Sequence, residues 1–126
     1  MITRHFSLIL DCGLPKFEIF KGKDNHFFFH LKAGNGEVIL ASQGYTAKSS
    51  CQNGVNSVAT NSKDEANFEK KVAKDGRHYF VLIAANKQVI GNSQMYTTSS
   101  ARDHGIHSVH DNANAAEVID LTKVTA

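Results

Sequence analysis

GYTAKSSCQNGVNSVATNS at residues 44–62 decides the fold, because MYTTSSARDHGIHSVHDNA at residues 95–113 repeats it. With an offset of 51 held constant, residues 17–62 align with residues 68–113 without a gap. Chance similarity among small residues does not keep Phe, Tyr and Asn in one register, so the chain contains a tandem duplication. The identical pairs include Phe17/Phe68, Glu18/Glu69, Lys23/Lys74, Asp24/Asp75, Phe29/Phe80, Leu31/Leu82, Asn35/Asn86, Val38/Val89, Tyr45/Tyr96, Gly54/Gly105, Val58/Val109 and Asn61/Asn112.

Each copy begins with three predicted strands. FEIFKG opens the first copy, and the turn sequences KDN and KDG tolerate positive φ. HFFFHLKA and RHYFVLIA are rich in aromatic and branched residues, as β-strands are. Asn35 and Gly36 form the best hairpin turn in the chain, whereas Asn86 and Lys87 keep only the Asn, so we expect the second turn to be less favourable.

A helix is predicted to follow the third strand, EVILAS or QVIGNS, in each copy. Thr46 and Thr97 are the candidate N-caps. Asn61 and Asn112 follow the last turn, where a left-handed residue commonly ends a helix. Apolar and small residues recur at helical spacing on one side.

Gly54 and Gly105 lie inside these helices, although Gly in a helix costs about 1 kcal/mol relative to Ala. Their retention in both copies predicts that the helix axis runs close to the sheet. A final strand is predicted in AAEVIDLT, residues 115–122, which the offset places over the opening of the second copy. The halves should therefore share or exchange strands, and residues 1–66 alone should dimerise or fail to fold.

The motif LKAxNGxVI…GY…S…GVxSV and the segment NKQVIGNSQMY resemble the duplicated bacterial subfamily of the YegP-like family, over about residues 16–122. This resemblance implies an α+β fold in which two tandem β-β-β-α-β repeats form one continuous, mainly antiparallel sheet. It also implies swapped C-terminal strands and two helices on one face. Single-unit relatives build the same sheet as a dimer, so the resemblance implies a monomer that acts as an internal pseudo-dimer. It implies no catalytic or binding residues.

The predicted organisation is one domain at residues 16–122, with repeat one at 16–66 and repeat two at 67–122. Residues 1–15 have no counterpart in the repeat and are predicted to be a loosely ordered extension; an extra edge strand or an upstream start codon are the alternatives. Residues 123–126 form a short tail.

Composition narrows the function classes. The net charge of +2 and pI of about 8.6 permit nucleic acid as a partner without favouring it. The apolar segment at residues 6–10 is too short for a signal peptide or a membrane span, so we expect a cytoplasmic protein with no membrane partner. Cys12 and Cys51 have no metal-site spacing and are expected to be reduced, although one disulfide stays possible.

Histidines at positions 104, 107 and 110 stand beside two aspartates, but zinc helices typically use an i, i+4 spacing. His104 and His107 point away from the apolar side of the predicted helix, which favours a solvated face over a metal site. The sequence shows no nucleophile elbow, and the AGNG turn leads into a strand rather than a helix. We therefore predict no enzyme activity, no catalytic residue, no metal and no cofactor.

Strand alternation gives the sheet two faces, and the identical Phe29/Phe80 and Leu31/Leu82 pairs should face the helices. A two-layer fold has nothing of its own to cover the opposite face, so exposed apolar residues there would mark a contact surface. The alternative is that loops, the tail or exchanged strands cover it, or that the exposure is ordinary. The candidate contact face consists of Phe28, His30, Lys32, Tyr79, Val81 and Ile83.

We expect this face to act in protein interaction or self-association, burying Tyr79 and its neighbours against a partner. The alternative function is weak single-stranded nucleic-acid binding, with Phe28 and Tyr79 stacking on bases. Glu18, Asp24 and Asp75 weaken this alternative, because they stand among the basic residues that would meet phosphates. Those basic residues are Lys21, Lys23, Lys32, Lys74 and Arg77.

Overall fold

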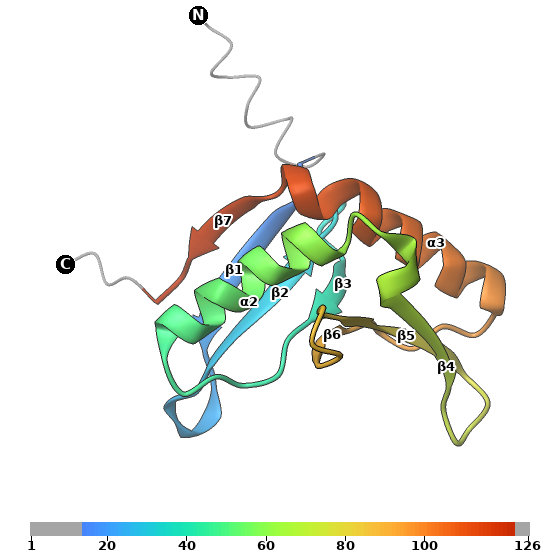
Figure 1. The fold of residues 1–126 in the computed structure, drawn as a ribbon, viewed down its shortest axis with the longest axis horizontal. Coiled ribbons are helices and arrows are strands. Elements are labelled where there is room, and N and C mark those ends of the chain that lie inside the picture. The colour runs from blue at the N-terminus through green and yellow to red at the C-terminus, as the bar shows by residue number, and fades with distance from the viewer. Residues whose placement is uncertain (1–13, 123–126) are drawn as a thin grey trace, which may run out of the picture.

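Residues 14–122, the part of the chain that the computed structural model describes, form a seven-stranded sheet with two helices across one face (Figure 1). Residues 1–13 of the predicted extension and the tail at 123–126 lie outside this range. Neither helix is long and apolar enough to cross a membrane. The elements are β1 (Lys16–Lys21), β2 (Phe27–Lys32), β3 (Val38–Ala41), α2 (Lys48–Asn61), β4 (Phe68–Val72), β5 (His78–Ile83), β6 (Val89–Asn92), α3 (Ser99–Asn112) and β7 (Glu117–Asp120).

The strand order is β4-β5-β6-β3-β2-β1-β7, and every neighbouring pair is antiparallel except β1 and β7. The halves meet where β3 lies beside β6, and there Ala41 pairs with Asn92. These two residues are equivalent under the repeat offset, as expected where equal units meet about a two-fold axis. The α+β architecture with one continuous sheet is confirmed.

Both halves build the same aromatic core under the helices. The rings of Phe17 and Phe29 meet edge to face at 5.9 Å, and those of Phe68 and Phe80 do so at 5.6 Å. Buried side chains from the two halves belong to a single cluster, so neither half encloses an interior of its own. The cluster consists of Phe17, Ile19, Phe29, Leu31, Ile39, Leu40, Cys51, Val55, Val58, Phe68, Phe80, Leu82, Ile90, Ile106, Val109 and Ala113.

The predicted close approach of helix and sheet is confirmed at both glycines. A Cβ atom on Gly54 would lie 2.6 Å from the Tyr45 hydroxyl oxygen, and one on Gly105 would meet the Tyr96 hydroxyl in the same way. Each tyrosine ring stacks on the central Phe of its own half. Glycine is thus kept because any side chain would displace the tyrosine.

The predicted helix N-caps are wrong by one residue. Ala47 occupies the N-cap of α2 and has no side chain that can accept a hydrogen bond. Thr98 caps α3, and its Oγ1 accepts a hydrogen bond from the Ala101 N–H at 3.0 Å. The threonines at 46 and 97 lie one position too early in a segment where several residues have capping side chains.

Asn61 and Asn112 end the helices as predicted, but neither residue has a left-handed backbone. Their side chains donate instead to the carbonyl oxygens of Ser57 and Ser108, at 2.8 and 2.7 Å. These bonds satisfy carbonyl groups in the last helical turn.

The hairpin turns differ between the copies as predicted. Gly36 has a φ of +89°, and Lys87, at the same place in the second copy, has a φ of +71°. A left-handed conformation costs a residue with a Cβ roughly 1–2 kcal/mol, so the second turn is the less favourable one. In both turns the Asn side chain accepts from the backbone N–H two residues on.

Strand exchange is one-sided, which corrects the expectation that both C-terminal strands swap. β7 crosses to the first half and lies parallel to β1, with Ile19 opposite Asp120. The equivalent segment of the first half, residues 66–69, merges into β4 instead. If a separate strand between α2 and β4 lay parallel to β4, the chain would need about a dozen further residues to return from its end to the start of β4. Only residues 62–67 separate α2 from β4, so no separate strand can form there.

Candidate functional site

The first strands of the two copies, β1 and β4, differ in whether another strand lies on their outer edge. Phe80 donates its N–H to Ser93 Oγ at 3.0 Å and accepts from Ser93 N–H at 2.9 Å, so its backbone groups point toward β6. Lys70, opposite Phe80, therefore directs its own N–H and C=O to the outer edge of β4. No strand of the described residues pairs with this edge. The equivalent carbonyl, on Ile19 of β1, accepts from the Leu121 N–H at 2.8 Å.

A groove of about 240 Å³ lies between β4 and α3, and we call it the edge groove. Phe68 and Ile106 form its apolar floor, with exposed fractions of 7% and 5%. Lys70 lies on the same side of β4 as Phe68, because alternate strand residues share a face. The lining residues are Glu65, Phe68, Lys70, Asp103, Ile106 and His107.

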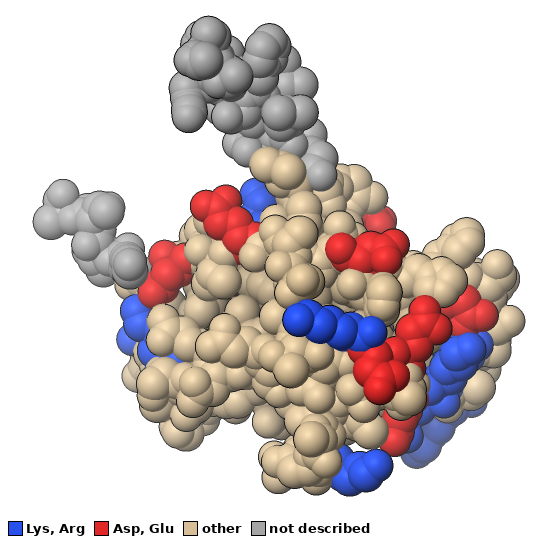
Figure 2. Space-filling model, turned by 45° about the horizontal axis from the view of Figure 1, so that its top comes forward, with Lys and Arg blue, Asp and Glu red and all other residues tan. Residues whose placement is uncertain are grey.

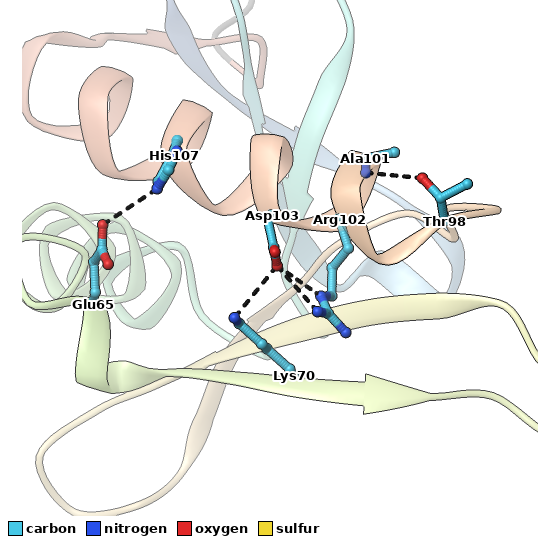
Figure 3. Close-up of polar contacts among 7 residues, drawn as sticks. All are labelled: Glu65, Lys70, Thr98, Ala101, Arg102, Asp103 and His107. Atoms are coloured by element: carbon cyan, nitrogen blue, oxygen red, sulfur yellow. Dashed lines mark hydrogen bonds and ion pairs between the residues drawn. The ribbon is translucent and has the colours of Figure 1, made fainter.

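Charged side chains line the walls of the edge groove (Figure 3). Arg102 donates from Nε and Nη2 to Asp103 Oδ1, both at 3.1 Å, and Lys70 Nζ lies 3.4 Å from the same oxygen. The hydrogen bond from Arg102, together with the Lys70 charge, holds the pKa of Asp103 below its usual value. Two cations thus share one carboxylate, and the Arg102 side chain is largely buried.

A second polar pair lies nearer the η3 turn (Glu65–Asn67), which leads into β4. His107 Nε2 lies 3.6 Å from Glu65 Oε2, and both side chains are exposed (Figure 3). The two pairs place polar and charged side chains along the length of the groove.

The first half has an equivalent groove of about 260 Å³ between β1, β7 and α2. The repeat offset places Lys70, Asp103 and His107 of the second half over Ile19, Gln52 and Asn56, while Ile106 replaces Val55 conservatively. The floor is therefore kept and the walls have become charged. In the first half β7 supplies one wall through Val118.

Asp120, the last residue of β7, forms an ion pair with Lys48 Nζ at 2.8 Å. Hydrogen bonds from Lys48 and Thr122 lower the pKa of Asp120 from 3.8 to about 2. Burial, and then the Asp120 charge, raises the pKa of the Cys51 thiol to about 11. Cys51 is a buried free thiol, and Cys12 lies outside the described residues.

In the first half of the sheet, the predicted contact face is a packed surface with half-buried side chains. Phe28 stacks on Phe20 at 5.7 Å, and His30 meets the edge of Phe20 at 4.8 Å. Lys32 pairs with Glu18 at 2.8 Å. Burial, followed by the Lys32 charge, lowers the pKa of His30.

In the second half, Tyr79 is half-buried, while Val81 and Ile83 are only 4% and 7% exposed. The two aliphatic residues of this part of the face are therefore buried rather than exposed. Binding by the remainder of the face stays a prediction. The structure brings the six predicted residues onto one side of the sheet but leaves no continuous exposed apolar row.

The histidines of α3 lie largely on the solvent side, with His104 and His107 exposed. Among residues 14–122, no group of three His, Cys, Asp or Glu side chains is arranged to hold a metal ion.

Sequence reasoning missed the edge groove because it considered the faces of the sheet and not its ends. Two signals were present. The offset places the last strand over the opening of the second copy, so one of the two expected strands had no sequence of its own. In addition, the second copy has Lys70, Asp103 and His107 where the first copy has uncharged residues, and the fold brings these three side chains together.

The fold defines a duplicated α+β protein in which one strand is exchanged and, among the described residues, no strand pairs with the outer edge of β4. Residues 23–69 and 73–120 each match the model of the Domain of unknown function (DUF1508), and the chain belongs to this family. It is 53% identical to a UPF0339 protein of Shewanella oneidensis over 106 residues, which cover 84% of this chain and 96% of the relative. It is 52% identical to the UPF0339 protein YegP of Escherichia coli K12 over 106 residues, with the same coverage of both chains.

Solved structures of relatives have the same fold. The solution NMR structure of YegP from E. coli, described as a protein of unknown function, has a TM-score of 0.83 and 49% identity. That match covers 89% of this chain and 97% of YegP. The solution NMR structure of a UPF0339 protein from S. oneidensis has a TM-score of 0.81 and 51% identity, and covers 85% and 91% of the two chains. The predicted family resemblance is thus confirmed.

Proposed function

We propose that this protein is a cytoplasmic, non-enzymatic protein-interaction module that binds an extended peptide as an added strand on the outer edge of β4. The observation that carries the proposal is that β7 lies along the outer edge of β1, whereas no strand of the described residues lies along the equivalent outer edge of β4. Strand addition derives affinity from main-chain hydrogen bonds and specificity from alternate side chains. The protein would act as a monomer, as an internal pseudo-dimer in which the outer edge of β4 has no neighbour among the described strands.

The sheet edge supports this role better than the sheet face. The outward backbone groups of Lys70 face solvent and can pair with an added strand, and the edge groove offers an apolar floor beside them. The face, in contrast, has Val81 and Ile83 already buried. Glu69 and Lys71 lie on the face of β4 directed away from α3, and their charges limit uncontrolled edge-to-edge association.

No observation favours the nucleic-acid alternative. Two of its basic residues are paired with carboxylates, Lys32 with Glu18 and Arg77 with Asp75, both at 2.8 Å. Basic and acidic side chains also lie next to one another on the surface that Figure 2 shows. Nucleic-acid binding proteins instead gather cations into one patch.

The test is selection of random 12-residue peptides displayed on phage against the intact protein, followed by fluorescence anisotropy of the selected peptides. Lys70→Pro removes the outward N–H and leaves the neighbouring bonds to β5, because proline is tolerated where an edge N–H faces solvent. We expect binding to the Lys70→Pro variant to be at least about tenfold weaker. The matched controls Phe28→Ala and Tyr79→Ala alter the sheet face and should leave affinity unchanged.

Three results would contradict the proposal. Selection that yields no binding peptide would mean that the charges on β4 merely protect a bare edge. Affinity lost in Tyr79→Ala and kept in Lys70→Pro would move the site to the sheet face. Salt-sensitive binding of single-stranded DNA or RNA by the intact protein, with no peptide bound, would support the nucleic-acid alternative.

A further inference from the structure

β7 shows how a strand sits on an edge of this kind. It runs parallel to β1, with Val118 opposite Phe17 and Asp120 opposite Ile19. Under the repeat offset, Phe17 and Ile19 correspond to Phe68 and Lys70 of β4. A strand added to β4 in the same manner would place one side chain opposite Phe68 and the next but one opposite Lys70, both directed toward α3.

The position opposite Phe68 is suited to an apolar residue. In the first half, Val118 lines the groove beside Val55 of α2. In the second half, Ile106 takes the place of Val55, and the floor formed by Phe68 and Ile106 is kept. An apolar side chain at this position would remove that floor from water.

The position opposite Lys70 is suited to an acidic residue, although the cations there differ from those in the first half. Asp120 forms its ion pair with Lys48, and the residue of the second half that corresponds to Lys48 is Ser99. The second half instead has Lys70 in place of Ile19, the residue opposite Asp120, and Arg102 in place of Cys51 donates to the same carboxylate oxygen that Lys70 contacts.

Lys70 and Arg102 both contact Oδ1 of Asp103, so two positive charges face one negative charge. The buried guanidinium strengthens this imbalance, because a buried cation is screened less by water. A carboxylate from an added strand would balance the second charge.

From these observations, and resting on the proposed function, we infer that the β4 edge selects peptides that run parallel to it, with an apolar residue opposite Phe68 and an acidic residue opposite Lys70. The motif is apolar-x-acidic, as in Val118, Ile119 and Asp120 of β7. The N-terminal side of the peptide lies next to η3.

The test is an NMR titration of the ¹⁵N-labelled full chain with the acetylated and amidated peptide AAEVIDLT, the sequence of residues 115–122. We expect the amide signals of Phe68, Lys70 and Ile106 to shift. Two variant peptides test the motif: one has Asn in place of Asp120, and the other has Ser in place of Val118. Each should bind about fivefold more weakly than the parent peptide. The Lys70→Glu variant should bind the parent peptide more weakly than the wild type does. It should bind more tightly to a peptide that has Lys in place of Asp120.

A nitroxide at the N-terminus of the peptide reports its direction. Parallel addition predicts broadening of the Asn67 amide and little effect at Val72, whereas antiparallel addition predicts the reverse and would overturn the inference. Shifts confined to β1 and α2 would also overturn it, because the peptide would then be displacing β7.

The variants separate this inference from the proposed function. If Lys70→Pro abolishes binding while the Asn and Ser peptides bind as well as the parent, the edge binds peptides without the proposed motif, and only the inference fails. If Lys70→Pro has no effect on any bound peptide, both fail.

Discussion

The β1 end and the β4 end of the sheet start from the same repeated sequence and reach opposite outcomes. β1 is covered by β7, and Ile19 is fully buried there. No described strand lies on the outer edge of β4, and Lys70, the counterpart of Ile19, is exposed. The comparison shows that a duplicated fold need not be symmetric at its edges.

Connection length explains the difference. The chain after α3 is free to continue into β7, whereas the chain after α2 must enter the second copy at once. The charged residues of the edge groove follow from this, since a position with no covering strand does not favour an apolar residue such as Ile19. The comparison can be tested by perturbing both ends in parallel.

The largest expected effect is loss of folding when the halves are separated. Residues 1–66 alone lack β6, which pairs with β3, and β7, which covers β1. The fragment should be unfolded or dimeric by circular dichroism and size-exclusion chromatography. A folded monomeric fragment would mean that the halves do not depend on a common core.

Phe29→Ala and Phe80→Ala should each lower the free energy of unfolding by about 3–5 kcal/mol, because each removes a fully buried ring from the common core. Denaturant unfolding of both variants should show one transition for the whole chain. Two separate transitions, each moved by only one of the variants, would show that the halves unfold independently.

Lys48→Met should lower the free energy of unfolding by about 1 kcal/mol at neutral pH, since it removes the partner of a largely buried carboxylate. The matched change at the open end, Lys70→Met, should stay within about 0.5 kcal/mol because its ion pair is exposed. Equal losses at both ends would contradict the comparison.

The same ion pair predicts a pH dependence. The folded protein lowers the pKa of Asp120 from 3.8 to about 2, so this group stabilises the fold above pH 3.8. That contribution is lost as the pH falls through this window toward about 2. Acid unfolding of the wild type and Lys48→Met should therefore differ in slope in this range, and identical curves would exclude a role for the pair.

The smallest expected effect concerns the two hairpin turns. Lys87→Gly should raise the free energy of unfolding by about 0.5–1 kcal/mol, because Lys87 has a φ of +71° that glycine adopts without strain. Gly36→Lys should lower it by a similar amount. Thermal unfolding of both variants measures this, and a loss of stability in Lys87→Gly would contradict the account of the turn.

Side-chain patterns predicted the parts of the fold that depend on faces. The repeated Phe29/Phe80 pair identified the helix-facing side, and Gly54 and Gly105 identified the close approach of helix to sheet. Those signals are local and occur twice. Helix ends were less well defined, and Thr98 rather than its neighbour caps α3, because several residues of this segment have capping side chains.

The open edge was not predicted, since strand alternation carries information about faces only. Which strand lies at an edge depends on how far a connection can reach, and here the connection before β4 is too short to add a strand. The residues of the edge groove are also distant in sequence, as Lys70 and Asp103 come from a strand and a helix that only the fold brings together.

Amide hydrogen exchange at Lys70 and Ile19 in the intact protein tests the central claim most directly. The account predicts that the Lys70 N–H exchanges within about tenfold of the rate in an unstructured peptide, while the Ile19 N–H, which the parallel register directs toward β7, is protected at least about a hundredfold. Protection of Lys70 equal to that of Ile19 would mean that the outer edge of β4 is already occupied, and would contradict the account.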